Sequence, residues 1–514
     1  MNYIAIFHAN LNYAYLTPDR YEYVIRNSYE LLLDTMREHF PDTKYVFEAS
    51  GYTLDTIANL TPDVLQKLRQ AVESGQCEFM GSPYAHPMLP NFPKEDGIWS
   101  LRFSQKTYEY HLGHRAKSFW NPECGWRSYV PEQAVETGYE NLLGDFEAYS
   151  RSCDSDGNPL RPEIYEKEQS SDEAFYDFGF NYDLPGTERA IHFPFKNLAC
   201  LPEDSLRVFL RTDRIAQFGV RFFMGMEDYT LDKYLALIQK YSAQPDDESE
   251  GALIIFADDA EYIGTNGWFR LKYQSQPDHV FERTPESRQN LINVIGKVKE
   301  MGDFVTFDEA CRDIDPMDDP LDFDDDSAWH GARASLWAKT PMAQMLRPWQ
   351  KLVRQKLKNV EDNVDPELAG KVWFHLTNSY NSDGQWPPTL PEAPHIIHPF
   401  NYRYCFENLL RAEMLLGGVD RSRLDLDPQH TVEKILSIQQ ERVLEKASQL
   451  MEEGDREEKS KARLARNLVE KSRLPLPDRA AAENVLRPSD YAVRANSLAE
   501  ARRLVGGIKI EEIP

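Results

Sequence analysis

The sequence predicts an α/β protein with parallel strands, followed by a mainly helical C-terminal region. Over roughly the first 300 positions, short apolar segments alternate with amphipathic ones at intervals of about 30 residues, which is typical of βα units in a parallel sheet or barrel. Beyond about residue 345, strongly charged segments with helical spacing replace the strands. A chain of 514 residues has room for about two to four domains.

The predicted strands are short apolar runs that stop at a polar residue or a glycine. They cover residues 3–8, 44–49, 76–80, 116–120, 139–143, 206–210 and 253–256, and we expect residues 304–306 to close the barrel. Helical spacing lies between them at 21–39, 52–74 and 96–112 and after Pro131. Within 52–74, Thr61 and Pro62 suit the first positions of a helix.

The remaining segments set the predicted domain boundaries. Helices are expected at 345–359, 401–416, 430–453 and 456–471, a long loop near the site at 150–190, and a boundary or solvated loop at 313–326, which holds eight Asp and two Pro. We therefore predict a catalytic barrel over 1–315, a helical domain over 316–455 that completes the active-site cleft, and a charged helical tail over 456–514.

Composition excludes several classes of partner. With 58 Lys and Arg against 84 Asp and Glu, the net charge is −26, which disfavours nucleic acid and anionic membrane surfaces. No apolar stretch approaches the ~20 residues that span a bilayer. The six cysteines are scattered without a Cys-x-x-Cys pair, and the N-terminus lacks the basic region of a signal peptide. We expect a cytoplasmic protein with reduced thiols.

Polar side chains follow the predicted strands one by one. They are His8, Asn10, Glu48, His86, Glu123, Asp145, Asp258 and Asp259, with Gly81 after the third strand. Parallel α/β folds bind their ligands at the C-terminal ends of the strands. We therefore expect these side chains to meet at one edge of the sheet.

Glu123 and the acids that follow residue 257 are the candidates for chemistry. Pro122 and Gly125 indicate a sharp turn around Glu123, although this acid could instead cap a helix or pair with Arg127. Asp258, Asp259 and Glu261 directly follow an apolar run, and such crowding raises at least one carboxyl pKa, as a general acid requires. A cation site or a helix cap is the alternative for this cluster. Two such acids are the minimal apparatus for cleaving a glycosidic bond.

Other residues suit a sugar site without proving one. Trp120 and Trp126 flank Glu123, and Trp329 precedes His330, so aromatic faces and hydrogen-bonding rings stand side by side. His8 and His86 could equally be core histidines. Zinc spacing, phosphate-binding Gly-rich loops and the Gly-x-Ser-x-Gly elbow are missing, so we expect neither a catalytic metal nor a cofactor.

Five segments, taken together and in this order, resemble glycoside hydrolase family 57. They are His8–Leu11, Gly75–Met80, Phe119–Gly125, Phe256–Gly264 and Asp325–Gly331, each similar to one motif of the family. The likeness extends over roughly residues 1–345. Asn10 and Leu11 replace the usual residues of the first motif, and Ala260 replaces a glycine of the fourth.

The resemblance implies an incomplete (β/α)7 barrel followed by a mainly helical C-terminal domain. It implies a retaining enzyme of the α-amylase or 4-α-glucanotransferase type that hydrolyses or transfers α-glucans such as starch, glycogen or maltooligosaccharides. Glu123 would be the nucleophile and Asp259 the acid/base. The expected substrate-binding residues are His8, Asn10, His86, Trp120, Asp258, Glu261, Trp329 and His330.

Two alternatives stay open at this point. A catalytically inactive relative would bind the oligo- or polysaccharide without turnover. A metal-dependent polysaccharide deacetylase would share the Asp-Asp motif, but it needs paired histidines near the N-terminus, which this sequence lacks. The motifs leave hydrolysis and transfer, the glycosidic linkage and the oligomeric state open.

Overall fold

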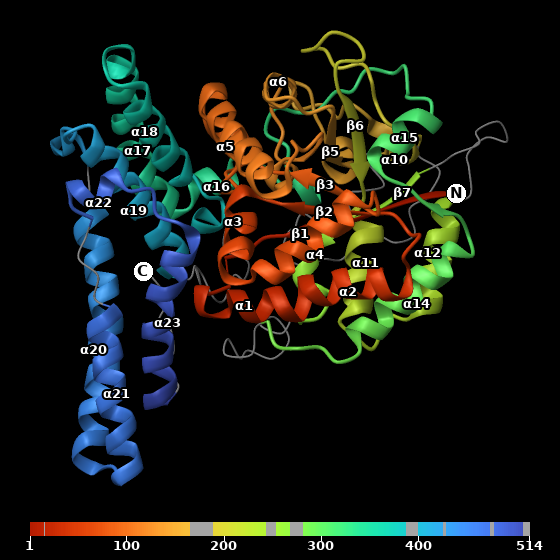
Figure 1. Cartoon of the computed structure of the whole chain (residues 1–514). Helices are drawn as coiled ribbons and strands as arrows, with labels where there is room; N and C mark the ends of the chain where they lie inside the picture. The colour runs from red at the N-terminus through yellow and green to blue at the C-terminus, as the bar shows by residue number, and fades with distance from the viewer. Residues whose placement is uncertain are drawn as a thin grey trace. The chain divides into compact units, whose positions relative to one another are not determined.

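The chain forms two compact units (Figure 1). The computed structural model describes residues 1–14, 16–164, 189–242, 253–267, 281–386, 399–424, 428–472 and 477–506. Met1–Asn10 and Glu22–Leu336 make up the first unit, and Leu11–Tyr21 and Trp337–Pro514 make up the second. The three-part division at residues 315 and 455 stays a prediction.

The first unit is built on a parallel sheet. Its strands are β1 (Asn2–Ala9), β2 (Tyr45–Ala49), β3 (Cys77–Gly81), β4 (Ser118–Trp120), β5 (Asn141–Asp145), β6 (Arg207–Arg211) and β7 (Leu253–Asp259), in the order β6-β5-β4-β3-β2-β1-β7. The short β8 (Asp303–Phe304) pairs with the first residues of β1, ahead of the point where β2 joins. The prediction that this segment closes the barrel is wrong, because β8 does not join the end strands β6 and β7. The prediction of an incomplete seven-stranded barrel is confirmed, and each predicted strand is present within a few residues.

Both faces of this sheet are covered, which explains why its strands are continuous apolar runs. In β1 and β7, for example, Ile4, Ile6 and Ile254 are almost fully buried. Figure 1 shows helices around the strands of this unit. The helices are α1 (Tyr21–Val24), α2 (Glu30–His39), α3 (Gly51–Leu60), α4 (Pro62–Glu73), α5 (Lys94–Leu112), α6 (Val130–Glu136), α7 (Phe146–Ser150), α10 (Arg189–His192), α11 (Asp213–Phe223), α12 (Leu231–Ser242), α14 (Ser287–Lys299) and α15 (Phe307–Asp313).

Two predicted helices are interrupted. The segment 52–74 is two helices, α3 and α4, because Thr61 leaves the helical region with φ −140° and ψ 64° ahead of Pro62. The segment 21–39 contains a π-helical turn at Ile25–Tyr29 between α1 and α2.

Of the predicted loop 150–190, residues 165–188 lie outside the described residues. The Asp-rich segment lies inside the first unit, where the N–H groups of Met317 and Leu321 donate to the carbonyls of residues 194 and 197.

The second unit is helical, as predicted. Its main helices are α17 (Pro341–Val360), α18 (Pro366–Asn378), α19 (Pro399–Leu415), α20 (Pro428–Glu453), α21 (Arg456–Ser472), α22 (Arg479–Glu483) and α23 (Pro488–Val505), of which α18, α22 and α23 were not individually predicted. A small core of alanines and valines, including Ala447, Ala465 and Ala501, joins α20, α21 and α23.

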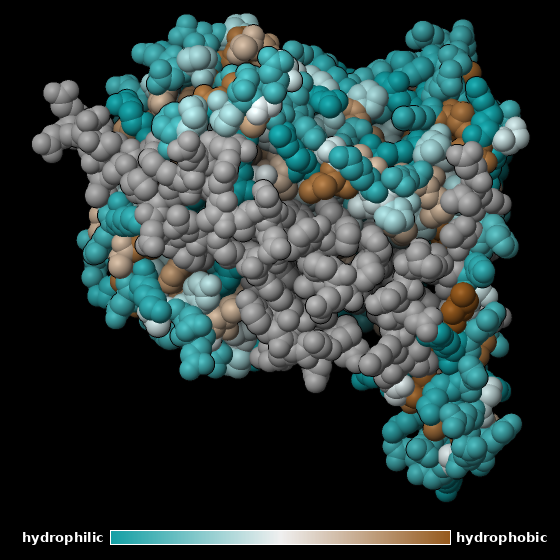
Figure 2. Space-filling model, turned by 180° about the vertical axis from the view of Figure 1, so that it is seen from behind, coloured by the Kyte–Doolittle hydropathy of each residue, from teal (hydrophilic) through white to brown (hydrophobic). Residues whose placement is uncertain are grey.

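On the face seen in Figure 2 the described surface is largely hydrophilic. Within the described part of the chain, every helix is too short or too polar to span a bilayer.

The turn after β7 packs tightly against the π-helical turn at residues 25–29. The Ser28 hydroxyl donates to the Glu261 carbonyl at 2.9 Å. A Cβ atom added at Gly264 would lie 1.8 Å from the Asn27 carbonyl oxygen, so the two backbones approach more closely than any side chain allows. Glycine at 264 is therefore needed to hold the residues that follow β7 in place.

We predict that Gly264→Ala lowers the free energy of unfolding by about 2–3 kcal/mol, because the backbone must shift to admit the methyl group. Gly296→Ala is the matched control. Nothing lies within 4 Å of its added Cβ, and it stands inside α14, so it should raise stability by about 0.5–1 kcal/mol. Urea denaturation of both variants checks this, and similar small effects at the two positions would refute the close approach.

Candidate active site

The strand register brings three ionisable side chains to one level of the sheet. His8 near the end of β1 pairs with Glu48 on β2 and with Asp259 on β7. Paired residues of parallel strands point to the same face, and neighbouring strands lie about 4.8 Å apart. The backbone alone therefore places these groups beside one another at the C-terminal end of the sheet, as the sequence predicts.

His8 is held as a cation. Its Nδ1 atom contacts Glu48 Oε2, and both side chains are buried. Burial by itself lowers the pKa of His8, but the contact with Glu48 and the charges of Asp259 and Glu261 outweigh burial and raise that pKa to about 10. The imidazolium ring stacks on Trp120, with 4.8 Å between the ring centroids.

Glu123 stands in a strained turn after β4. Its backbone φ is 56°, in the left-handed region that non-glycine residues rarely adopt, which confirms the predicted sharp turn. Its Oε1 atom lies 3.8 Å from Nδ1 of His86, whose ring centroid is 5.2 Å from that of His8. Burial and the charge of His8 hold the pKa of His86 well below its usual range, so this imidazole is neutral. A series of neighbours, His86 and then His8, thus links Glu123 to Asp259.

Asp259 is one of the carboxyl groups whose protonation the site favours. Burial and the charges of Asp258 and Glu261, with a smaller contribution from Glu123, raise the pKa of Asp259 well above its ordinary value against the opposing charge of His8. This is the direction expected from the crowding in the sequence. The residue Asp259 stays 7% exposed, more than Asp258 or Glu261. A protonated carboxyl group with residual exposure is suited to donate a proton.

Glu261 and Asn10 belong to the same group of residues. Glu261 Oε1 accepts a hydrogen bond from the Asn10 backbone N–H at 2.9 Å and contacts the Tyr29 hydroxyl. Burial raises the pKa of Glu261 to about 7, although Tyr29, His8 and the Asn10 amide all favour its charged form. Asn10 therefore contributes its backbone here, which its side-chain type could not reveal.

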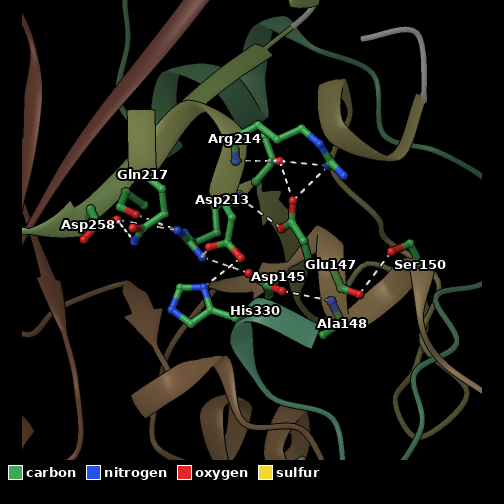
Figure 3. A network of polar contacts seen from close by, with 12 residues as sticks. Asp145, Glu147, Ala148, Ser150, Asp213, Arg214, Gln217, Asp258 and His330 are labelled. Carbon is green, nitrogen blue, oxygen red and sulfur yellow. Dashed lines mark hydrogen bonds and ion pairs between the residues drawn. The ribbon is translucent and has the colours of Figure 1, made fainter. Parts of the chain in front are cut away.

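Asp258 is bound on both oxygens by the protein (Figure 3). Its Oδ1 accepts from the Asp259 N–H at 2.8 Å, and its Oδ2 accepts from Gln217 Nε2 at 2.9 Å. The guanidinium of Arg211 lies 3.8 Å from the same Oδ2 atom. Asp258 thus connects Asp259 to a buried arginine that the sequence analysis missed.

Trp329 and His330 lie in a turn whose His330 has φ 58°. Their ring centroids are 4.5 Å apart, and His330 Nδ1 lies 2.7 Å from Asp213 Oδ2. The Arg211 guanidinium carbon is 5.7 Å from the centroid of the Trp329 ring. This turn is therefore attached to the network around Arg211, and contacts through Asp213, Arg211 and Asp258 link it to Asp259.

A cluster of three carboxylates stands beneath this turn. Asp145, Glu147 and Asp213 bring their oxygens within 4.8 Å of one another, and among the described residues they are the group that could hold a metal ion. Arg211 pairs with Asp145 and Asp213 at 2.8 Å each, and Arg214 pairs with Glu147 at 2.9 Å. Two guanidinium groups thus supply the positive charge that a cation would bring, so the cluster fits an ion network better than a metal site.

Arg211 and Asp213 could have been found from the sequence. Both follow the predicted strand 206–210, so the rule that singled out polar residues after the other strands applies to them as well. Glu147, Arg214 and Gln217 carry no such signal, because they stand in helices α7 and α11 and reach the network only through the fold.

A parallel barrel with buried acids at the ends of its strands suits an enzyme, and a pair of acids is the apparatus that glycosidic-bond cleavage requires. The model of the glycosyl hydrolase family 57 matches residues 1–284, which is more than half of the chain. The chain belongs to glycosyl hydrolase family 57.

Similarity to curated relatives is confined to a part of each chain. A 4-alpha-glucanotransferase of Thermococcus litoralis is 30% identical over 125 residues, which are 24% of this chain and 19% of the relative. A 1,4-alpha-glucan branching enzyme of Thermococcus kodakarensis is 28% identical over 120 residues, 22% of this chain and 18% of the relative. The matches thus span about a fifth of these relatives.

The fold extends further than the sequence similarity. The GH57-type branching enzyme of Pyrococcus horikoshii superposes with a TM-score of 0.57 at 12% identity, over 84% of this chain and 93% of that one. An alpha-amylase of Thermotoga maritima superposes with a TM-score of 0.54 at 13% identity, over 82% and 94%. At this identity the likeness establishes the shared fold.

We predict that Glu48→Gln lowers the pKa of His8 by about two units or more. The neutral amide no longer stabilises the imidazolium, whereas burial still disfavours the charged form. The measurement is an NMR titration of the histidine side chains, in which wild-type His8 should stay protonated past pH 8. Glu78→Gln is the control, since Glu78 on β3 bonds to Ser118 and to the Phe307 N–H and should leave the His8 titration unchanged. A wild-type His8 that loses its proton near pH 6 would contradict the assignment of a cation.

Proposed function

We propose that the protein is a retaining glycoside hydrolase or transglycosylase that acts on α-glucans, with Glu123 as nucleophile and Asp259 as acid/base. Membership of family 57 supports the reaction class, and the names of the relatives support α-glucans as substrate. The observation that carries the residue assignment is the environment of Asp259. Burial, together with the charges of the carboxylates around it, Glu123 among them, raises the pKa of Asp259 and favours its protonated form.

In the first step Asp259 gives its proton to the glycosidic oxygen while a Glu123 oxygen attacks the anomeric carbon. The bond from that carbon to the glycosidic oxygen breaks, the leaving sugar departs as an alcohol, and the remaining sugar is held as an ester of Glu123. Asp259 is left as a carboxylate. The buried His8 imidazolium lies beside it in the strand register and stabilises this negative charge.

In the second step the Asp259 carboxylate takes a proton from a water molecule or a sugar hydroxyl, whose oxygen attacks the same carbon. The ester bond breaks, Glu123 is restored as a carboxylate, and two inversions retain the configuration. Water as acceptor gives hydrolysis and a glucan hydroxyl gives transfer.

The proposed binding residues supply two kinds of contact. The ring of Trp329 offers a face for sugar C–H groups, whereas Trp120 is buried and stacked on His8, so we assign Trp120 a supporting role. The polar groups of His8, Asn10, His86, Asp258, Glu261 and His330 offer partners or support for hydroxyl groups. Asp258 already accepts bonds from the protein on both oxygens, so we assign it a supporting role.

We predict that Asp259→Asn lowers kcat/KM on maltoheptaose by about 10²–10⁴-fold, the usual loss of a general acid. Glu123→Gln should lower it at least as much, because no covalent intermediate forms. Chromatography of the products measures turnover, and NMR of the first products should show the α-configuration retained. Glu22→Gln, at an exposed glutamate in α1, is the control and should keep wild-type activity.

Other outcomes point to other functions. Either active-site variant with near wild-type turnover would refute the assigned roles. A wild-type protein that binds maltoheptaose without converting it would be the inactive relative. Stoichiometric zinc with release of acetate from acetylated glycans would identify a deacetylase.

A further inference from the structure

The barrel has an open seam between β6 and β7. These strands end the hydrogen-bonded order of the sheet, and among the described residues no backbone ladder joins them, although they approach each other. The Arg211 side chain, from the last residue of β6, crosses this seam. Its Nε–H donates to the Ala257 carbonyl of β7 at 2.9 Å.

The other nitrogens of Arg211 reach three carboxylates. Nη1 lies 2.8 Å from Asp145 Oδ2 and 2.8 Å from Asp213 Oδ1, and Nη2 lies 3.8 Å from Asp258 Oδ2. The side chain is fully buried, so solvent does not screen these interactions. A single guanidinium therefore joins the ends of β5, β6 and β7.

Two of these contacts act on the residues directly before Asp259. Arg211 holds the carbonyl of Ala257 and lies next to the carboxylate of Asp258, and that carboxylate accepts from the Asp259 N–H. Gln217 of α11 supports the same carboxylate from a second side. The ladder with β1 holds Asp259 from one side. On the other side, where a backbone ladder is missing, Arg211 of β6 contacts the two residues before Asp259.

We propose that Arg211 is a positioning residue that aims the Asp259 carboxyl group at the glycosidic oxygen; the proposal rests on the acid/base role proposed above. If Arg211 were only a countercharge for the buried carboxylates, it would stabilise the fold without affecting proton donation by Asp259. Arg214 supplies the comparison, because it is equally buried, stands three residues away and pairs with Glu147 at 2.9 Å.

The test compares substrates that differ in their need for a proton. Maltoheptaose has a poor leaving group, a sugar alkoxide that needs a proton. In a 2,4-dinitrophenyl α-maltoside the leaving group is 2,4-dinitrophenolate, which departs with little help from an acid. Arg211→Lys should lower kcat/KM on maltoheptaose by about 10–100-fold, since a small misplacement of a reacting group costs this much. On the aryl substrate its loss should stay below about threefold. Arg214→Lys should change both values by one common factor.

Equal losses on the two substrates for Arg211→Lys would overturn the proposal. Asp259→Asn, measured in parallel, must show the same selective loss. If it does not, the proposed acid role itself fails, and this result is distinguishable from a failure confined to Arg211. If circular dichroism shows that Arg211→Lys does not fold, Asp258→Asn, which keeps the shape but weakens the tie to the guanidinium, decides by the same comparison.

Discussion

The burial of several carboxylates beside one another, at the ends of neighbouring strands, is the constraint on which the rest of this site depends. Each buried carboxylate costs several kcal/mol in lost hydration unless a cation or donors compensate it. Among the described residues the fold supplies the cations His8 on β1, Arg211 on β6 and Arg214 on α11. Together with Gln217 and the backbone amides they determine which acids can be charged.

The compensation is uneven, and this unevenness is chemically useful. Although burial raises the pKa of Asp213, His330 and Arg211 hold it well below its usual range, so Asp213 is a permanent anion. Burial and the charges of Asp213 and Glu147 raise the pKa of Asp145 despite the same arginine. Neighbouring carboxylates with pKa values pushed apart are the arrangement from which acid and base roles arise. Asp259, like Asp145, has its pKa raised by burial and neighbouring carboxylates, which favours its protonated form.

The sequence predicted the strands, and with them the level of the site, because parallel strands are continuous apolar runs that end in polar residues. It did not predict how the side chains pair. Arg211 meets Ala257 and Asp145 at separations of 46 and 66 positions, and His8 meets Glu48 at 40. Such pairs depend on strand order and register, which no local pattern contains. The break of the segment 52–74 at Thr61 was within reach, since proline restricts the residue before it.

Backbone strain marks the same region as the charges do. Glu123, His86 and His330 all adopt positive φ, a conformation that costs non-glycine residues of the order of 1–3 kcal/mol each. Each lies in a short hydrogen-bonded turn, so the backbone of the turn sets the direction of its side chain. Strain of this kind persists only where the surroundings fix it, and here the buried sheet and the ion network do so. The site thus combines buried charges with strained backbone, both of which cost free energy. The surrounding fold, stabilised by other interactions, holds them in place.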